Sequence, residues 1–145
     1  MLRNRIVNGQ KASDATYVAH KALVRGMAVV KGTDGKTAFV AEATDAGVFL
    51  VDRDNLPVGV ECAYADRPDS AFDKIVEGDL IKLVPYVNGE SFYTDQYDAG
   101  AEVAGTALGA GLDGKWEALA GGTKYVSRGT ETVAGKVMLV VEVIA

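Results

Sequence analysis

The sequence predicts an all-β fold, a compact β-barrel or β-sandwich built from hairpins, with an extended N-terminal arm. Turn dipeptides stand between apolar runs at Asp34-Gly35, Asn88-Gly89 and Asp113-Gly114. Such pairs favour the positive φ angles of tight hairpin turns. The segment Lys136–Ala145 reads KVMLVVEVIA, which is typical of a strand held inside a sheet. With 145 residues, 48% of them apolar, the chain can bury the core of one domain.

The N-terminal segment has the least regular pattern. Residues 1–12 are expected to be irregular. Residues 13–25 fit two structures, because Ser13 or Asp14 can cap a helix, whereas Thr16–Val18 is good strand material. Both possibilities remain open on the sequence alone.

The first hairpin has a register that can be counted from its turn. Counting back from Asp34-Gly35 pairs Val30 with Phe39 and Val29 with Val40, which places large apolar side chains opposite one another. The strands expected along the chain are Ala28–Lys31, Lys36–Ala41, Val48–Val51, Val58–Tyr64, Leu80–Val87, Ser91–Thr94, Ala107–Gly111, Lys115–Leu119 and Lys136–Ala145. A single helical turn is expected over Ser70–Val76.

Two further hairpins are expected in the second half. The turn at Asn88-Gly89 would pair Val84 with Tyr93. The turn at Asp113-Gly114 would place Gly111 opposite Trp116, so that the ring covers the bare glycine backbone.

Charge is unevenly placed along the chain. Residues 1–25 carry five basic side chains against one acidic side chain, a net charge of +4, and the remainder carries −9. An acidic body repels phosphates, so nucleic acid is not expected as a partner. The longest apolar run, Val137–Val141, is far shorter than a membrane span, so no membrane partner is expected. Cys62 is the only cysteine, which excludes an internal disulfide and fits synthesis in a reducing cytoplasm.

No motif predicts an enzyme, a cofactor or a metal. Residues 109–114 match the letters of a dinucleotide-binding glycine loop, but the run after them is too short for the helix that such a loop requires. His20 is the only histidine and has no acid beside it, and Cys62 has no base or helix terminus to activate it. We therefore expect neither catalysis nor a bound transition metal.

Two other classes of function stay open as alternatives. A carbohydrate- or small-ligand-binding module would use an exposed aromatic platform, drawn from Tyr86, Phe92, Tyr93, Tyr97 and Trp116. A hydrolase would need a pair of loop carboxylates, drawn from Asp45, Asp52, Asp54, Asp66, Asp69 and Asp73.

Several of these features together resemble a known family. The acidic, cysteine-poor body, the basic leading segment, the small-residue stretch Gly100–Gly114 and the segments Gly78–Leu80 and Gly105–Leu108 are similar to the head decoration, or cement, proteins of tailed bacteriophages. The likeness extends over Val24–Ala145. It implies a compact β domain that binds the outer face of an assembled capsid, frequently as a trimer, and stabilises the shell.

The charge and the apolar pattern divide the chain into two expected parts with different roles. Residues 1–22 would form a docking arm that contributes little to folding, and residues 23–145 the β domain. The arm residues expected to bind the major capsid protein are Leu2, Arg3, Arg5, Ile6, Val7, Lys11 and Tyr17. The residues expected to form a homotrimer interface are Leu108, Gly109, Gly111 and Trp116. The protein would lie on the capsid exterior of the virion, after synthesis in the host cytoplasm.

Overall fold

The computed structural model describes the whole chain except residues 10–12, 43–47, 53–73, 112, 122–123 and 145. This part of the chain is all-β, which confirms the predicted fold class, and it contains no helix that could cross a membrane. Its strands are β1 (Leu2–Ile6), β2 (Asp14–Ala19), β3 (Leu23–Val24), β4 (Ala28–Lys31), β5 (Thr37–Val40), β6 (Phe49–Asp52), β7 (Lys74–Ile75), β8 (Leu80–Val84), β9 (Ser91–Thr94), β10 (Ala107–Ala110), β11 (Trp116–Ala118), β12 (Tyr125–Val133) and β13 (Lys136–Val143).

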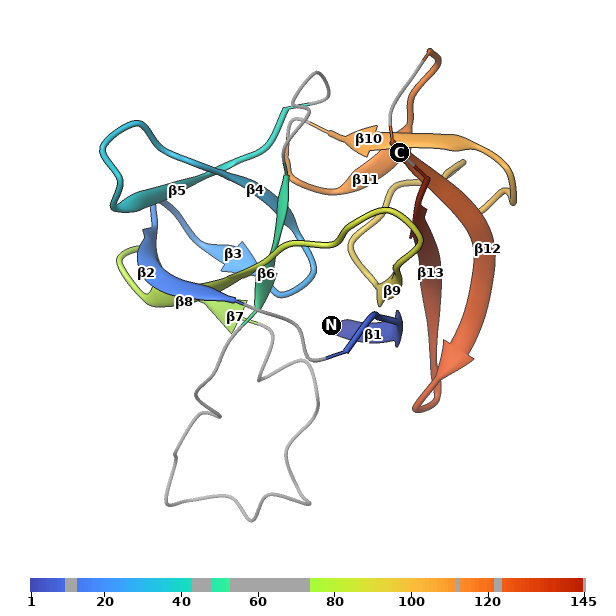
Figure 1. The fold of residues 1–145 in the computed structure, drawn as a ribbon, viewed down its shortest axis with the longest axis horizontal. Coiled ribbons are helices and arrows are strands. Elements are labelled where there is room, and N and C mark those ends of the chain that lie inside the picture. Colours follow the sequence, from blue (N-terminus) through green and yellow to red (C-terminus); the bar gives the residue numbers. More distant parts are fainter. Residues whose placement is uncertain (10–12, 43–47, 53–73, 112, 122–123, 145) are drawn as a thin grey trace.

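One half of the molecule is a closed barrel with the strand order β2-β5-β4-β6-β8 (Figure 1). The pair β2–β5 is parallel, and the other barrel pairs are antiparallel. Side chains alternate along each strand, so Val29 and Val51 point into the barrel, whereas Ala28 and Leu50 join the core outside it. The buried barrel interior consists of Tyr17, Ala19, Leu23, Met27, Val29, Ala38, Val51, Ile75, Ile81 and Leu83.

The other half is a six-stranded sheet with the order β1-β9-β13-β12-β10-β11 (Figure 1). Its β11 edge is covered, because the Trp116 N–H donates to the Gln96 carbonyl at 3.0 Å and the Asp98 N–H donates to the Trp116 carbonyl at 2.8 Å. The chain that leaves β9 therefore returns alongside β11. At the other edge of the sheet lies β1.

The main hydrophobic core combines the six-stranded sheet with the outer side of the barrel. It contains Leu50 and Val84 from the barrel and Leu139 from the centre of the sheet. Phe92 and Trp116 pack with their ring centroids 5.8 Å apart, and both side chains are completely buried. This shared core makes the two halves one packed unit.

The hairpin at Asp34-Gly35 is confirmed to the residue. β4 and β5 pair Val30 with Phe39 and Val29 with Val40, as counted from the turn. The Asp34 carboxylate accepts hydrogen bonds from the N–H groups of Lys36 and Thr37 and fixes the turn. The hydrogen bonds of the turn therefore support this register.

The prediction of a hairpin at Asn88-Gly89 is wrong. β8 lies in the barrel and β9 in the six-stranded sheet, so Val84 pairs with Leu50 and Tyr93 with Arg3 and Val140. The dipeptide still makes a turn, in which the Gly89 N–H donates to the Val143 carbonyl at 2.8 Å. The turn therefore connects the barrel strand β8 with β9 of the six-stranded sheet.

The hairpin at Asp113-Gly114 is confirmed, but its predicted register is wrong by one residue. Trp116 pairs with Ala110 and not with Gly111. The Gly111 N–H donates to the Lys115 carbonyl at 2.6 Å, so Lys115 lies opposite Gly111. The turn, in which Gly114 has a φ of 78°, therefore sets the cross-strand pairs one position away from those counted for a two-residue turn.

The prediction that residues 1–12 are irregular is wrong for Leu2–Ile6, and residues 10–12 of that range lie outside the described residues. Leu2–Ile6 forms β1 and pairs antiparallel with β9, from Leu2 opposite Thr94 to Ile6 opposite Ser91. The open choice within residues 13–25 is settled in favour of strands, because β2 and β3 occupy that range.

Two other expectations fall wholly or partly outside the described residues. The strand expected over Val58–Tyr64 lies there, as does most of the turn expected over Ser70–Val76. The described end of that turn, Lys74–Ile75, is β7, which pairs with β3 as a strand and not as a helical turn.

Candidate functional site

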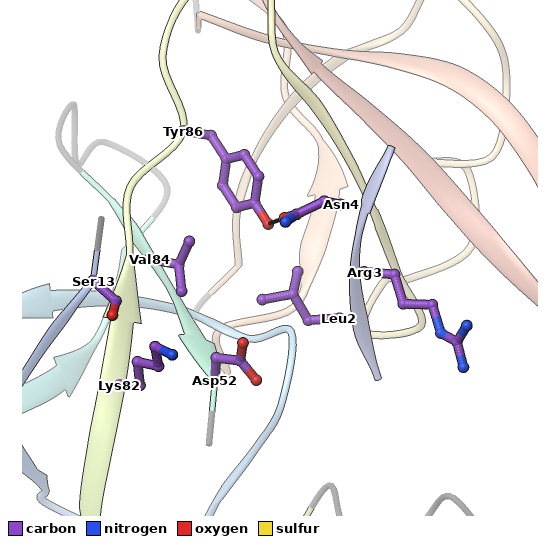
Figure 2. A pocket seen from close by; sticks show the side chains of 8 residues that line it. All are labelled: Leu2, Arg3, Asn4, Ser13, Asp52, Lys82, Val84 and Tyr86. Carbon is purple, nitrogen blue, oxygen red and sulfur yellow. Dashed lines mark hydrogen bonds between the residues drawn. The ribbon is translucent and has the colours of Figure 1, made fainter. Parts of the chain in front are cut away.

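A polar cleft lies between the edge strand β1 and the barrel strands β6 and β8. Its volume is about 250 Å³, and Figure 2 shows the side chains that surround it. They come from both halves of the molecule and are Leu2, Arg3, Asn4, Ser13, Asp52, Lys82, Val84 and Tyr86. The cleft is thus a candidate binding site made by the junction of sheet and barrel.

The first residue of the chain fixes one end of β1. The Met1 amino group donates to Asp95 Oδ1 at 2.5 Å and to the Arg25 carbonyl at 3.0 Å. Gly26 makes this approach possible, because a Cβ at its position would lie 2.6 Å from Thr94 Oγ1 and 2.7 Å from the Met1 carbonyl oxygen.

A buried carboxylate fixes the chain just after the other end of β1. Glu90 is 3% exposed, and its Oε1 accepts a hydrogen bond from the Asn8 N–H at 3.1 Å. Its Oε2 accepts from the Val87 N–H at 2.9 Å. The strand β1 is therefore held at both ends before any partner binds.

Tyr86 and Asn4 connect the two walls of the cleft. The Tyr86 hydroxyl donates to Asn4 Oδ1 at 2.5 Å (Figure 2). Burial, with the nearby charges of Asp52 and Glu90, raises the pKa of Tyr86 far above its usual value. The hydroxyl therefore stays protonated and remains a hydrogen-bond donor. The oxygen of the Asn4 amide accepts this bond, so the amide nitrogen takes no part in it.

The charged residues among the described lining of the cleft are Arg3, Asp52 and Lys82. Asp52 is its one acid, and Arg25 Nε donates to Asp52 Oδ1 at 2.8 Å. Arg25 also donates to the Leu2 carbonyl at 3.3 Å, so it links β1 to β6. Lys82 lies opposite Asp52 on β8.

The outer side of β1 carries an exposed polar network. Glu131 on β12 accepts a hydrogen bond from the Tyr93 hydroxyl at 2.6 Å and from Arg5 at 3.3 Å. The Tyr93 hydrogen bond, with the charge of Arg5, lowers the pKa of Glu131. Arg3 is exposed and makes no ion pair with any residue that the structure describes.

The residues expected to bind a capsid are divided by the fold. Arg3, Arg5 and Ile6 are exposed on β1. Leu2 is 4% exposed and belongs to the main core, and Tyr17 is 8% exposed and belongs to the barrel interior. These two side chains are not available for docking, because each supports its own sheet.

The remaining residues of the expected arm have two different outcomes. Val7 is partly buried and packs against the main core. Lys11 lies outside the described residues. Because β1 and β2 are integral strands of the two sheets, the expectation that residues 1–22 contribute little to folding is wrong.

The residues expected at a trimer interface lie inside the chain. Leu108 and Trp116 are completely buried in the main core. Gly109 and Gly111 are buried as well, and the Glu117 carboxylate lies close to Gly111. The apolar pattern at these positions therefore reflects the internal core, and the side chains are not available to a neighbouring subunit.

The candidate catalytic and metal-binding residues are only partly described by the structure. No three side chains of His, Cys, Asp or Glu converge in the described part of the chain. His20 Nδ1 lies 3.1 Å from the Ala38 carbonyl, and its ring packs against Phe39. Cys62 and five of the six candidate carboxylates lie outside the described residues, and the sixth, Asp52, is paired with Arg25.

Sequence reasoning missed the residues that position the site. Asp95, Glu90 and Tyr86 act through partners that are distant along the chain, so no local spacing identifies them. Lys82 offered one signal, since it is a lone charge within the apolar run of β8. Comparisons of the chain with protein-family models, curated proteins and solved structures found no match.

Proposed function

We propose that this chain is a structural protein that binds the outer surface of an assembled phage capsid and stabilises the shell. Its partner would be the major capsid protein, and it would act on the exterior of the virion after synthesis in the host cytoplasm. The resemblance to head decoration proteins motivates the proposal. The arrangement of β1 is the observation that supports it.

The strand β1 presents exposed Arg3, Arg5 and Ile6 on a fixed backbone. Its ends are tied by the ion pair of Met1 with Asp95 and by the hydrogen bond of Asn8 to Glu90. A surface that is ordered before binding avoids most of the conformational entropy cost of ordering a free arm. Docking would therefore occur on a rigid strand, and the arm would not need to fold on contact.

Electrostatics favours an acidic partner surface for this strand. Arg3 and Arg5 are cationic in a chain whose net charge is −5. Complementary charges steer association and fix orientation more than they add affinity, and Ile6 supplies an apolar contact next to them. The strand β1 thus offers two cations that would steer the partner and one apolar side chain that would contact it.

The alternatives have less support from the geometry. A carbohydrate platform needs exposed aromatic faces, but Trp116, Phe92 and Tyr86 are buried in the main core, and only Tyr93 and Tyr97 of the five candidates are partly exposed. A hydrolase needs two facing carboxylates, and among the described residues that line the cleft Asp52 is the one acid and forms an ion pair with Arg25. Neither alternative accounts for the exposed residues of β1.

The test is co-sedimentation with undecorated icosahedral heads assembled from the cognate major capsid protein. The double variant Arg3→Glu, Ile6→Asp is expected to lose binding, whereas Lys36→Glu, in the distant β4–β5 turn, is expected to bind as wild type. Both variants should melt as wild type, because all three side chains are exposed. Wild-type protein that does not sediment with the heads, or a double variant that binds fully, would contradict the proposal. Subunit counting on the heads tests the expected homotrimer.

A further inference from the structure

We propose that Asn8, just after β1, is a site of spontaneous covalent modification, at which the asparagine deamidates to aspartate and isoaspartate. Asparagine or aspartate precedes glycine at residues 8–9, 34–35, 88–89 and 113–114. Such pairs react through the main-chain nitrogen of the glycine. Among the described residues, the Gly9 N–H is the one of these four that has no hydrogen-bond acceptor.

The reaction needs only the chain itself and water. Hydroxide removes the Gly9 amide proton, and the nitrogen attacks Cγ of Asn8, so that a new C–N bond closes a succinimide ring. The bond from Cγ to the side-chain nitrogen breaks, and that nitrogen takes a proton from water and leaves as ammonia. Water then opens the ring at Cγ to give aspartate, or at the main-chain carbonyl to give isoaspartate. Glycine favours ring closure because it has no Cβ and adopts the widest range of backbone conformations.

The pair Asn88-Gly89 is an internal comparison with a nearly identical sequence. Residues 7–10 read VNGQ and residues 87–90 read VNGE, so the local sequence gives both asparagines similar reactivity. In the fold, however, the Gly89 N–H donates to the Val143 carbonyl at 2.8 Å. An amide proton in such a bond is removed only after local opening of the structure. Asn88 is therefore protected although its side chain is exposed.

The two aspartate pairs are protected in the same way. The Gly35 N–H donates to the Gly32 carbonyl at 3.2 Å. The Gly114 N–H donates to the Gly111 carbonyl at 3.0 Å. The turn hydrogen bonds that shape these hairpins thus also hold the nitrogen that would react.

Asn8 is fixed on one side and open on the other. Its own N–H donates to Glu90 Oε1 at 3.1 Å. Asn8 and Gly9 are exposed, and the Asn8 side chain has no hydrogen-bond partner among the described residues. A Cβ at Gly9 would have no described atom within 4 Å, which leaves room for the ring. The same space surrounds Gly89, so the hydrogen bond of its N–H, and not crowding, distinguishes the two sites.

The modification changes the charge beside β1. The neutral amide of Asn8 becomes a carboxylate at the end of the strand that exposes Arg3 and Arg5. Added negative charge weakens attraction to an acidic partner surface. Docking would therefore weaken as the protein ages, a consequence that rests on the proposed function, whereas the modification itself does not.

The direct test is to incubate the purified full chain in mildly alkaline buffer and to follow both asparagines by mass spectrometry. Trypsin releases residues 6–11 and residues 83–115 as separate peptides. In the folded chain, Asn8 should convert about tenfold faster than Asn88 or more, because reaction at Asn88 must wait for local opening. In urea, where the fold is lost, the two rates should become similar. Labelling by an isoaspartyl methyltransferase identifies the isoaspartate product.

Matched variants assign the charge change to one residue. Asn8→Ala keeps the N–H that Glu90 binds, and it should abolish the acidic species that accumulates on ion exchange. Asn88→Ala should leave that species unchanged. Equal conversion of the two asparagines in the folded chain, faster conversion of Asn88, or an undiminished acidic species in Asn8→Ala would overturn the inference.

Co-sedimentation with heads tests the consequence for docking separately. Aged wild-type protein should bind less than fresh protein, whereas aged Asn8→Ala should bind as it does when fresh. Equal losses on ageing would overturn the consequence for docking. Fresh wild-type protein that does not bind heads would refute the proposed function and not the modification, which the mass spectra decide.

Discussion

The strands β1 and β13 lie in the same sheet but contribute to the protein in opposite ways. β13 runs through the centre of the sheet between β9 and β12, and Leu139, Val140 and Val141 are completely buried. β1 lies at the edge, with one buried side chain, Leu2, and exposed residues after it. The central strand stabilises the fold on both of its faces. The edge strand anchors itself through one side chain and presents the others to solvent.

This difference separates stability from binding along the chain. In β13, Met138–Val141 and Val143 are buried, so substitutions at these positions should act on the free energy of unfolding. In β1, only Leu2 and the ties at the strand's ends should act on it, and the exposed side chains are available for a partner. Four predictions test this separation, from the largest effect to the smallest.

The largest effect is expected at the centre of β13. Leu139→Ala removes a completely buried side chain from the main core. We expect a loss of about 2–5 kcal/mol in the free energy of unfolding, from lost burial and from the cavity left behind. Urea unfolding measures it. The matched control is Val137→Ala on the same strand, where the side chain is 56% exposed and the midpoint should hardly move.

The second prediction transfers the comparison to β1. Leu2→Ala should cost about 2–3 kcal/mol, the lower part of the range for such a change, because an edge site can partly close over the lost volume. Ile6→Ala is the matched control, since Ile6 is 56% exposed. Urea midpoints of the two variants decide between the two roles of the strand. Equal midpoints for both variants would mean that β1 is not anchored through Leu2.

The sequence predicted the all-β class and the regions with local determinants. Asp34-Gly35 fixed a register through its own turn hydrogen bonds, and the apolar run after Lys136 identified β13. The sequence did not predict β1, because this edge strand buries only Leu2 and so shows no alternation of apolar and polar residues. β12 was also missed. Its polar residues face solvent, and its turn at Ala134-Gly135 lacks the usual Asn or Asp.

The candidate site was predicted only in part, for a physical reason. Charge pattern correctly placed Arg3 and Arg5 at the surface, because an unpaired charge is rarely buried. The same pattern could not distinguish a free arm from an edge strand, since the partners of β1 lie far away in sequence. Trp116 shows the converse error, in which an apolar residue was assigned to an interface although it fills the chain's own core.

The third prediction concerns Asp95, which connects the beginnings of both strands. Its carboxylate accepts from the Met1 amino group, from Lys136 of β13 and from Gln96. Burial alone would raise the pKa of Asp95, but these hydrogen bonds outweigh it and lower the pKa. Asp95→Asn should therefore cost about 1–2 kcal/mol at neutral pH, because two ammonium groups lose a charged acceptor.

The pH dependence gives the sign of this effect. A carboxyl whose pKa is lower in the folded state stabilises the fold above its unfolded pKa, and the stabilisation is lost as the pH falls through the folded value. Urea unfolding of wild type and Asp95→Asn between pH 7 and pH 2 measures it. The difference between them should shrink as the pH falls below the ordinary aspartate pKa of 3.8. A constant difference would show that Asp95 acts by packing and not by charge.

The smallest effect on stability, and the sharpest test of the comparison, is expected at Arg5. Its ion pair with Glu131 spans 3.3 Å at the exposed surface, where solvent screens it. Arg5→Gln should leave the urea midpoint unchanged, whereas it should weaken co-sedimentation with capsid heads and reduce the dependence of binding on salt. Arg128→Gln, which breaks the exposed pair with Glu142 on β13, is the matched control for losing a cation from this sheet. If both variants weaken binding equally, the net charge of the sheet drives docking. If only Arg5→Gln weakens it, the contact belongs to β1.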